Sequence, residues 1–92
     1  MNLIQHYING KISSGDSSRK GKVFNPANGT QESEVILGSK SDLDKAVEHA
    51  KKAYLTWSTT PPIQRARIIF KYKELIEKNS DEITKIIVSE HG

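Results

Sequence analysis

The 92-residue sequence contains no cysteine, and this absence removes several kinds of chemistry at once. Without thiols these residues can form no disulfide framework, no thiolate metal site and no cysteine nucleophile. The N-terminal part also lacks a long apolar run, so neither a signal peptide nor a membrane span is expected. The composition predicts a soluble, cytoplasmic chain with no membrane partner.

An excess of one charge is also missing. The chain has 14 Lys and Arg residues against 11 Asp and Glu residues, with a net charge of +3. Acidic and basic residues recur at the i, i+4 spacing of exposed helical pairs. These pairs are Glu48–Lys52, Glu74–Lys78 and Asp81–Lys85. Because the basic residues are not gathered on one element among exposed aromatics, we expect no nucleic-acid binding.

The motifs of several common sites are absent as well. The three histidines, His6, His49 and His91, are far apart in sequence, and Glu90 beside His91 would point elsewhere on a helix. No serine lies in a Gly-x-Ser-x-Gly turn, and the dinucleotide fingerprint G-x-G-x-x-G does not occur. The stretch 13–21, rich in serine and glycine, lacks phosphate-loop spacing and is predicted to be a surface loop. The residues themselves predict no catalytic, cofactor-binding or metal-binding residue.

Short strands are predicted in residues 1–38. Asn9–Gly10 favours a tight hairpin turn between strands at 6–8 and 11–12, since both residues tolerate positive φ. A further strand is predicted at 22–24, and another at 34–37 after a turn at Asn28–Gly29. Such short, polar strands are only marginally stable in isolation, so we expect them to pack against a larger structure.

Three helices are predicted in residues 39–92. The first helix is predicted to have its N-cap at Ser39 and Asp42 at its third position, and apolar residues then recur at steps of three and four. These are Leu43, Ala46, Val47, Ala50, Ala53, Tyr54 and Trp57. The second helix runs from an N-cap at Thr60, or equally at Thr59 or Pro61, to Asn79. The third begins at Ser80 and is capped by Gly92.

The connection between the two long helices is short, so they are expected to be antiparallel neighbours. The second of them is apolar around roughly twice the ~100° arc of an ordinary surface helix. Ile63, Ala66 and Phe70 lie on one side, and Ile68, Tyr72, Leu75 and Ile76 on the other. A chain with 35% hydrophobic residues supplies too little to cover both sides. The remainder of a longer chain, or a second copy, is expected to contact Ile68, Tyr72, Leu75 and Ile76.

Several segments, in order, resemble the aldehyde dehydrogenase superfamily. They include YINGK at 7–11, VFNPANG at 23–29, DLDKAVEHAKKAYLTW at 42–57, KELIE at 73–77 and EHG at 90–92. Asn28 and Tyr54 depart from the family, which often has Thr and Phe there. Within it, TPPIQRARIIFKYKELIEKN at 60–79 is most similar to the CoA-acylating methylmalonate-semialdehyde dehydrogenases.

The resemblance implies an α/β fold class, namely the N-terminal part of an aldehyde dehydrogenase-like fold. Short antiparallel strands with loops would occupy residues 1–38. Residues 39–92 would be the helical part of an incomplete nicotinamide-binding domain, with an antiparallel pair of long helices and a third helix.

It also implies a parent enzyme, a homo-oligomer that uses NAD and CoA to convert methylmalonate or malonate semialdehyde to an acyl-CoA. Its cysteine nucleophile and its NAD contacts would lie outside these residues, so no site residue is transferred and this segment alone is expected to be inactive. Two alternatives remain. The chain could belong to a hydrolytic aldehyde dehydrogenase, or be a non-catalytic helical hairpin that binds a partner protein.

Overall fold

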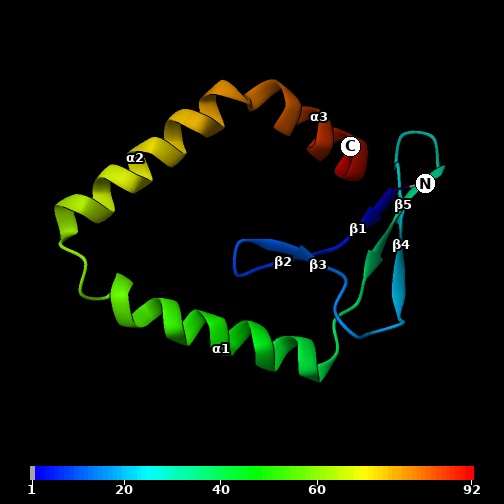
Figure 1. Ribbon diagram of the computed structural model, residues 1–92. Helices are drawn as coiled ribbons and strands as arrows, with labels where there is room; N and C mark the ends of the chain where they lie inside the picture. The colour runs from blue at the N-terminus through cyan, green and yellow to red at the C-terminus, as the bar shows by residue number, and fades with distance from the viewer. Residues whose placement is uncertain (1) are drawn as a thin grey trace.

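The computed structural model describes residues 2–92, with the strands in the first part of the chain and the helices in the second (Figure 1). A three-stranded sheet has the order β1–β5–β4. β1 (Asn2–Ile4) pairs in parallel with β5 (Gln31–Ile36), and β4 (Lys20–Phe24) pairs antiparallel with β5. The β2 (His6–Ile8) and β3 (Lys11–Ser13) strands form a separate antiparallel hairpin. The sequence predicted antiparallel strands, and the parallel pairing of β1 with β5 is a correction to that prediction. It was missed because β1 itself was not predicted.

Both predicted turns are present. In the β2–β3 hairpin, Asn9 and Gly10 have φ angles of 55° and 72°, and Ile8 pairs with Lys11 across the turn. In the turn between β4 and β5, Asn25 donates its backbone N–H to the Thr30 carbonyl at 2.9 Å. The strands on either side begin earlier than predicted, at Lys20 and Gln31.

The three predicted helices are confirmed as α1 (Lys40–Trp57), α2 (Pro62–Lys78) and α3 (Ser80–His91). Pro61, one of the three predicted alternatives, is the N-cap of α2. α3 follows directly after Asn79, and Gly92, at φ +83°, donates its N–H to the Val88 carbonyl at 2.9 Å. None of the helices in residues 2–92 has the length and apolar composition that a membrane span requires.

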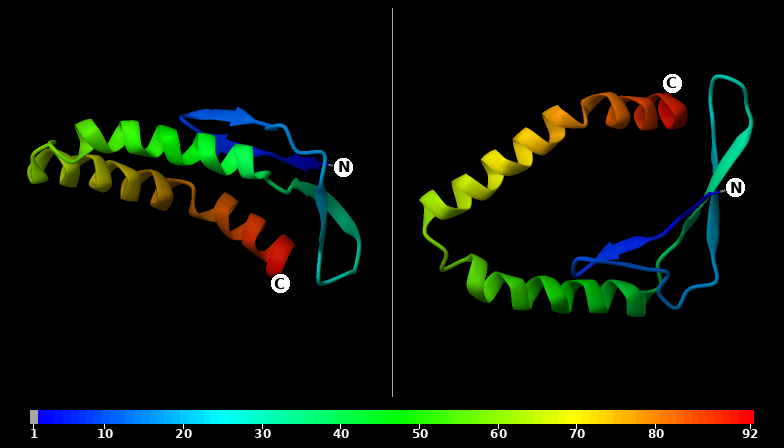
Figure 2. Two further views of the ribbon diagram at one scale, coloured as in Figure 1. Left: turned by 90° about the horizontal axis from the view of Figure 1, so that it is seen from below. Right: turned by 45° about the horizontal axis from the view of Figure 1, so that its top comes forward.

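The two long helices do not pack along their lengths. From the connection between them, α1 and α2 diverge as the arms of an open V (Figures 1 and 2). The small residues Ala46, Ala50 and Ala53 of α1 instead line a groove with Tyr7 and Ile8 of the hairpin. The expected close antiparallel pair is therefore not formed within the described residues, and Ala50 and Ala53 on the apolar face of α1 remain exposed.

Very little of the chain is buried. Ile36, 6% exposed, is the one buried hydrophobic residue described, while Phe70 and Leu75, on the two sides of α2, are 64% and 47% exposed. The accessible surface is 7620 Å², whereas a compact chain of this mass exposes about 5,400 Å². The radius of gyration is 16.9 Å, against about 12 Å for a compact 92-residue domain. The described residues therefore leave most of the apolar surface of the helices exposed.

Candidate functional site

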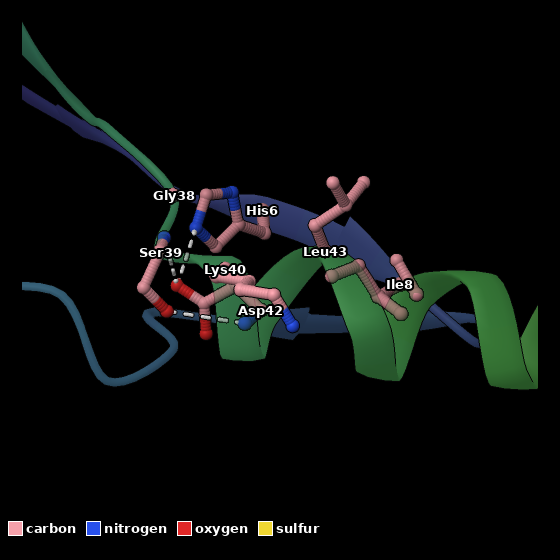
Figure 3. Close-up of a pocket in the computed structure, with 8 residues that line it drawn as sticks. His6, Ile8, Gly38, Ser39, Lys40, Asp42 and Leu43 are labelled. Carbon is pink, nitrogen blue, oxygen red and sulfur yellow. Dashed lines mark hydrogen bonds and ion pairs between the residues drawn. The ribbon is translucent and has the colours of Figure 1, made fainter.

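Three segments of the chain meet at the start of α1, around Asp42 (Figure 3). Asp42 is 5% exposed and is the one buried charged residue described. Its Oδ2 accepts a hydrogen bond from the Ser39 backbone N–H at 3.0 Å, and Ser39 Oγ accepts one from the Asp42 N–H at 3.1 Å. This reciprocal pair is a capping box, formed by the N-cap and third-position residues predicted from the sequence.

The same carboxylate also anchors the loop between β3 and β4. Asp42 Oδ1 accepts a hydrogen bond from the Asp16 backbone N–H at 3.2 Å, and Ser39 Oγ donates to Asp16 Oδ1 at 2.6 Å. A few residues on, Arg19 Nη2 donates to the Gly38 carbonyl at 3.0 Å. The predicted surface loop is therefore tied to the helix N-terminus at two places.

His6 completes this junction from β2. Its Nε2 lies 3.7 Å from Asp42 Oδ2, too far for a hydrogen bond but close enough for an ion pair when the imidazole is protonated. The nitrogen is buried, and no hydrogen-bond partner for it exists among residues 2–92. Next to it, Ile8, Leu43 and Ala46 form the apolar wall of a shallow pocket (Figure 3).

The pKa of Asp42 lies below the ordinary value for a carboxyl group. The main cause is the hydrogen bond from the Ser39 backbone N–H, which stabilises the carboxylate. Burial opposes this effect, while the Asp16 N–H, the Ser39 side chain and the charge of His6 add to it. Asp42 is therefore ionised at neutral pH.

This junction has no arrangement for catalysis. Ser39 Oγ is engaged by the Asp42 N–H and by Asp16, so it is not set against His6 as a nucleophile would be. No three His, Asp or Glu side chains of residues 2–92 are placed to hold a metal ion. His49 lies in α1, whereas Glu90 and His91 lie at the end of α3. The structure does not bring these side chains together, and the sequence predicted a site at none of them.

The N-termini of α1 and α2 do not fit the pyrophosphate of a dinucleotide either. The N-terminus of α1 already faces the carboxylates of Asp16 and Asp42, which would repel a phosphate. That of α2 begins with Pro61 and Pro62, which have no N–H to donate. The geometry around Asp42 is that of a structural junction.

Asp42 makes the junction sensitive to acid. Because its pKa is lowered in the folded state, its stabilising contribution is complete at neutral pH and is lost on acidification below about pH 4. Amide hydrogen exchange at Asp16 and Ser39 should show protection that falls in this range. The isosteric Asp42→Asn variant should show weaker protection at neutral pH and little further loss in acid. An equal acid-dependent loss in the variant would contradict this role.

Comparison with known proteins extends beyond the junction to nearly the whole chain. Residues 12–92 match the sequence model of the aldehyde dehydrogenase family. A malonate-semialdehyde dehydrogenase of Bacillus pumilus is 39% identical over 98% of this chain, and one of Pseudomonas aeruginosa is 38% identical over 100% of it. In both cases the chain spans 18% of the length of the relative.

Solved structures show the same arrangement of elements. The methylmalonate-semialdehyde dehydrogenase of Oceanimonas doudoroffii matches 100% of this chain with a TM-score of 0.95 and 41% identity, the chain covering 19% of that protein. A candidate methylmalonate-semialdehyde dehydrogenase of Sinorhizobium meliloti 1021, in complex with NAD, matches 98% of it with a TM-score of 0.95 and 40% identity, and 18% of that protein is covered. The chain belongs to the aldehyde dehydrogenase family.

Proposed function

We propose that this chain is the N-terminal segment of an NAD-dependent, CoA-acylating methylmalonate- or malonate-semialdehyde dehydrogenase. One observation carries the proposal: an open arrangement of elements, with almost no core of its own, superposes on 19% of a much longer dehydrogenase at a TM-score of 0.95. Relatives named for malonate semialdehyde match at 38–39% identity over nearly all of the chain. They support a semialdehyde substrate and a catalytic parent over the non-catalytic alternative, and the choice between CoA-acylating and hydrolytic chemistry is tested below.

The parent enzyme would convert the semialdehyde, CoA and NAD to an acyl-CoA, CO₂ and NADH. NAD would accept the hydride, and a cysteine thiolate would carry the acyl group to CoA as a thioester. These 92 residues contain no cysteine, so the nucleophile would lie elsewhere in the parent. In this proposal none of the 92 residues is catalytic, cofactor-binding or metal-binding.

The segment would instead supply structure to the parent. Residues 1–38 would form a small β region, and residues 39–92 the helical part of the nicotinamide-binding domain. The exposed apolar side of α2 would contact the rest of the parent chain or a second copy; its residues are Ile68, Tyr72, Leu75 and Ile76. A cytoplasmic homo-oligomer is part of the same proposal.

The natural full-length protein, purified from its own reading frame, should produce NADH when given malonate or methylmalonate semialdehyde together with CoA. Residues 1–92 alone should give no NADH above the no-enzyme background, because they lack the nucleophile. The assay is the increase in NADH absorbance, with acyl-CoA identified by mass spectrometry.

Omitting CoA is the control that separates the acylating enzyme from a hydrolytic one. An enzyme that forms free acid equally well without CoA would contradict the CoA-acylating function. A full-length protein that never reduces NAD with these semialdehydes would overturn the proposal as a whole.

A further inference from the structure

Two Asn–Gly dipeptides form turns in this chain, Asn9–Gly10 and Asn28–Gly29, and all four residues are exposed. Both glycines have φ +72°, and a Cβ added to either would meet no atom within 4 Å. In such a dipeptide the glycine nitrogen meets no side chain of its own residue as it approaches the asparagine side-chain carbonyl. The two turns therefore have the same intrinsic tendency to cyclise, and only their surroundings distinguish them.

The Asn28–Gly29 turn holds both reacting groups in hydrogen bonds. Asn28 Oδ1 accepts from the Thr30 backbone N–H at 2.9 Å. The Gly29 N–H, which must lose its proton for the nitrogen to attack, donates to the Asn25 carbonyl at 2.8 Å. This turn also joins β4 to β5, which is itself paired on its other side with β1. Opening it would disturb the three-stranded sheet.

The Asn9–Gly10 turn lacks these restraints. Within residues 2–92, neither the Asn9 side chain nor the Gly10 N–H has a hydrogen-bond partner. The flanking strands are three residues long and form a hairpin separate from the larger sheet. Their cross-strand pair Tyr7–Ile12 is largely exposed and adds little burial. Local opening should therefore cost less here than at Asn28.

We propose that Asn9–Gly10 is a site of spontaneous deamidation and isoaspartate formation. The Gly10 amide nitrogen loses its proton and attacks Asn9 Cγ, forming a new C–N bond as the side-chain nitrogen leaves as ammonia. The product is a five-membered succinimide. Water then opens one of its two carbonyl–nitrogen bonds, giving aspartate or isoaspartate, and no oxidant or other reactant is required.

The two products differ in what they do to the hairpin. Aspartate keeps the normal backbone, and its new charge would lie at a hollow lined by Lys11 and Lys45, which favour an anion, and by the carboxylate of Asp42, which opposes one. Isoaspartate places an extra methylene in the backbone of a two-residue turn, so that Ile8 can no longer pair with Lys11 in register. Formation of isoaspartate would therefore disrupt the pairing of β2 with β3.

The test compares the two turns in one sample of the natural full-length protein. The protein is incubated at mildly alkaline pH, digested at intervals and analysed by peptide mass mapping, with isoaspartyl methyltransferase labelling to identify isoaspartate. Asn9 should convert several-fold faster than Asn28, with both aspartate and isoaspartate among the products. In denaturant the two sites should convert at similar rates, because the difference comes from the fold.

The Asn9→Gln variant is the matched control. It should abolish modification at the hairpin while leaving the rate at Asn28 unchanged. Equal rates at the two sites in the folded protein, or faster conversion at Asn28, would overturn the proposal. So would a folded protein in which Asn9 stays intact while both sites convert in denaturant.

Discussion

Replacing Leu75 by alanine in the natural full-length protein is expected to lower the free energy of unfolding by about 2–5 kcal/mol, the usual cost of removing a buried leucine side chain. Leu75 is half-exposed in residues 2–92, so the contacts visible here predict a smaller cost. The larger value follows from the proposal that further chain, or a second copy, covers this side of α2. The difference is measured by denaturant unfolding of both proteins. The slope m of the free energy of unfolding against denaturant concentration should be the same in the two proteins.

Lys71→Ala is the matched control on the same helix. Lys71 lies on the polar arc of α2, and its Nζ is 3.5 Å from Glu74 Oε2 in an exposed pair. Such pairs contribute little, so this variant should change stability by no more than about 0.5 kcal/mol. If Leu75→Ala also stayed within that limit, this side of α2 would be solvent-exposed in the whole protein and the proposed contact would be wrong.

The helices were predictable because their ends depend on local sequence. Ser39 and Asp42 cap α1 through hydrogen bonds between residues three apart, and the prolines at the start of α2 fix φ where an N–H is not needed. The Asn9–Gly10 turn is local in the same sense. In each case the physical cause lies within a few residues, where a single sequence shows it.

The junction around Asp42 was predicted only in part, because most of its contacts are long-range. The capping box is local, but His6 and Asp16 reach Asp42 from distant points in the chain. Nothing in the sequence around His6 or Asp16 indicates that contact. The parallel pairing of β1 with β5 was missed for the same reason, since neither strand marks its partner.

The packing of α1 against α2 was predicted from a pattern that does not identify partners. Periodicity shows that a helix has an apolar face, and the alanines of α1 do form one. Within the described residues that face does not pack on α2, and Ala50 and Ala53 stay exposed beside the hollow that they line with the β2–β3 hairpin. The wide apolar arc of α2 was more informative, because it indicated an excess of apolar surface without requiring a choice of partner.

Gly15→Ala is expected to destabilise the Asp42 junction more strongly than any change at the hairpin turns. Gly15 has φ +65°, and a Cβ built on it would lie 2.7 Å from Asp42 Cγ, well inside contact distance. Asp42 cannot move away without breaking its hydrogen bonds to the Ser39 and Asp16 N–H groups. Backbone strain and this overlap together should cost more than about 2 kcal/mol, measured by denaturant unfolding.

The Gly10→Ala variant is the control that introduces backbone strain without a steric overlap. Gly10 has a similar positive φ of +72°, but an added Cβ meets nothing within 4 Å, so only the strain of about 1–2 kcal/mol should be seen. Amide hydrogen exchange at Asp16 and Ser39 provides the local measurement. It should accelerate in the Gly15 variant and stay unchanged in the Gly10 variant, because only the first substitution displaces the carboxylate. Equal exchange in the two variants would show that the loop is not held against Asp42.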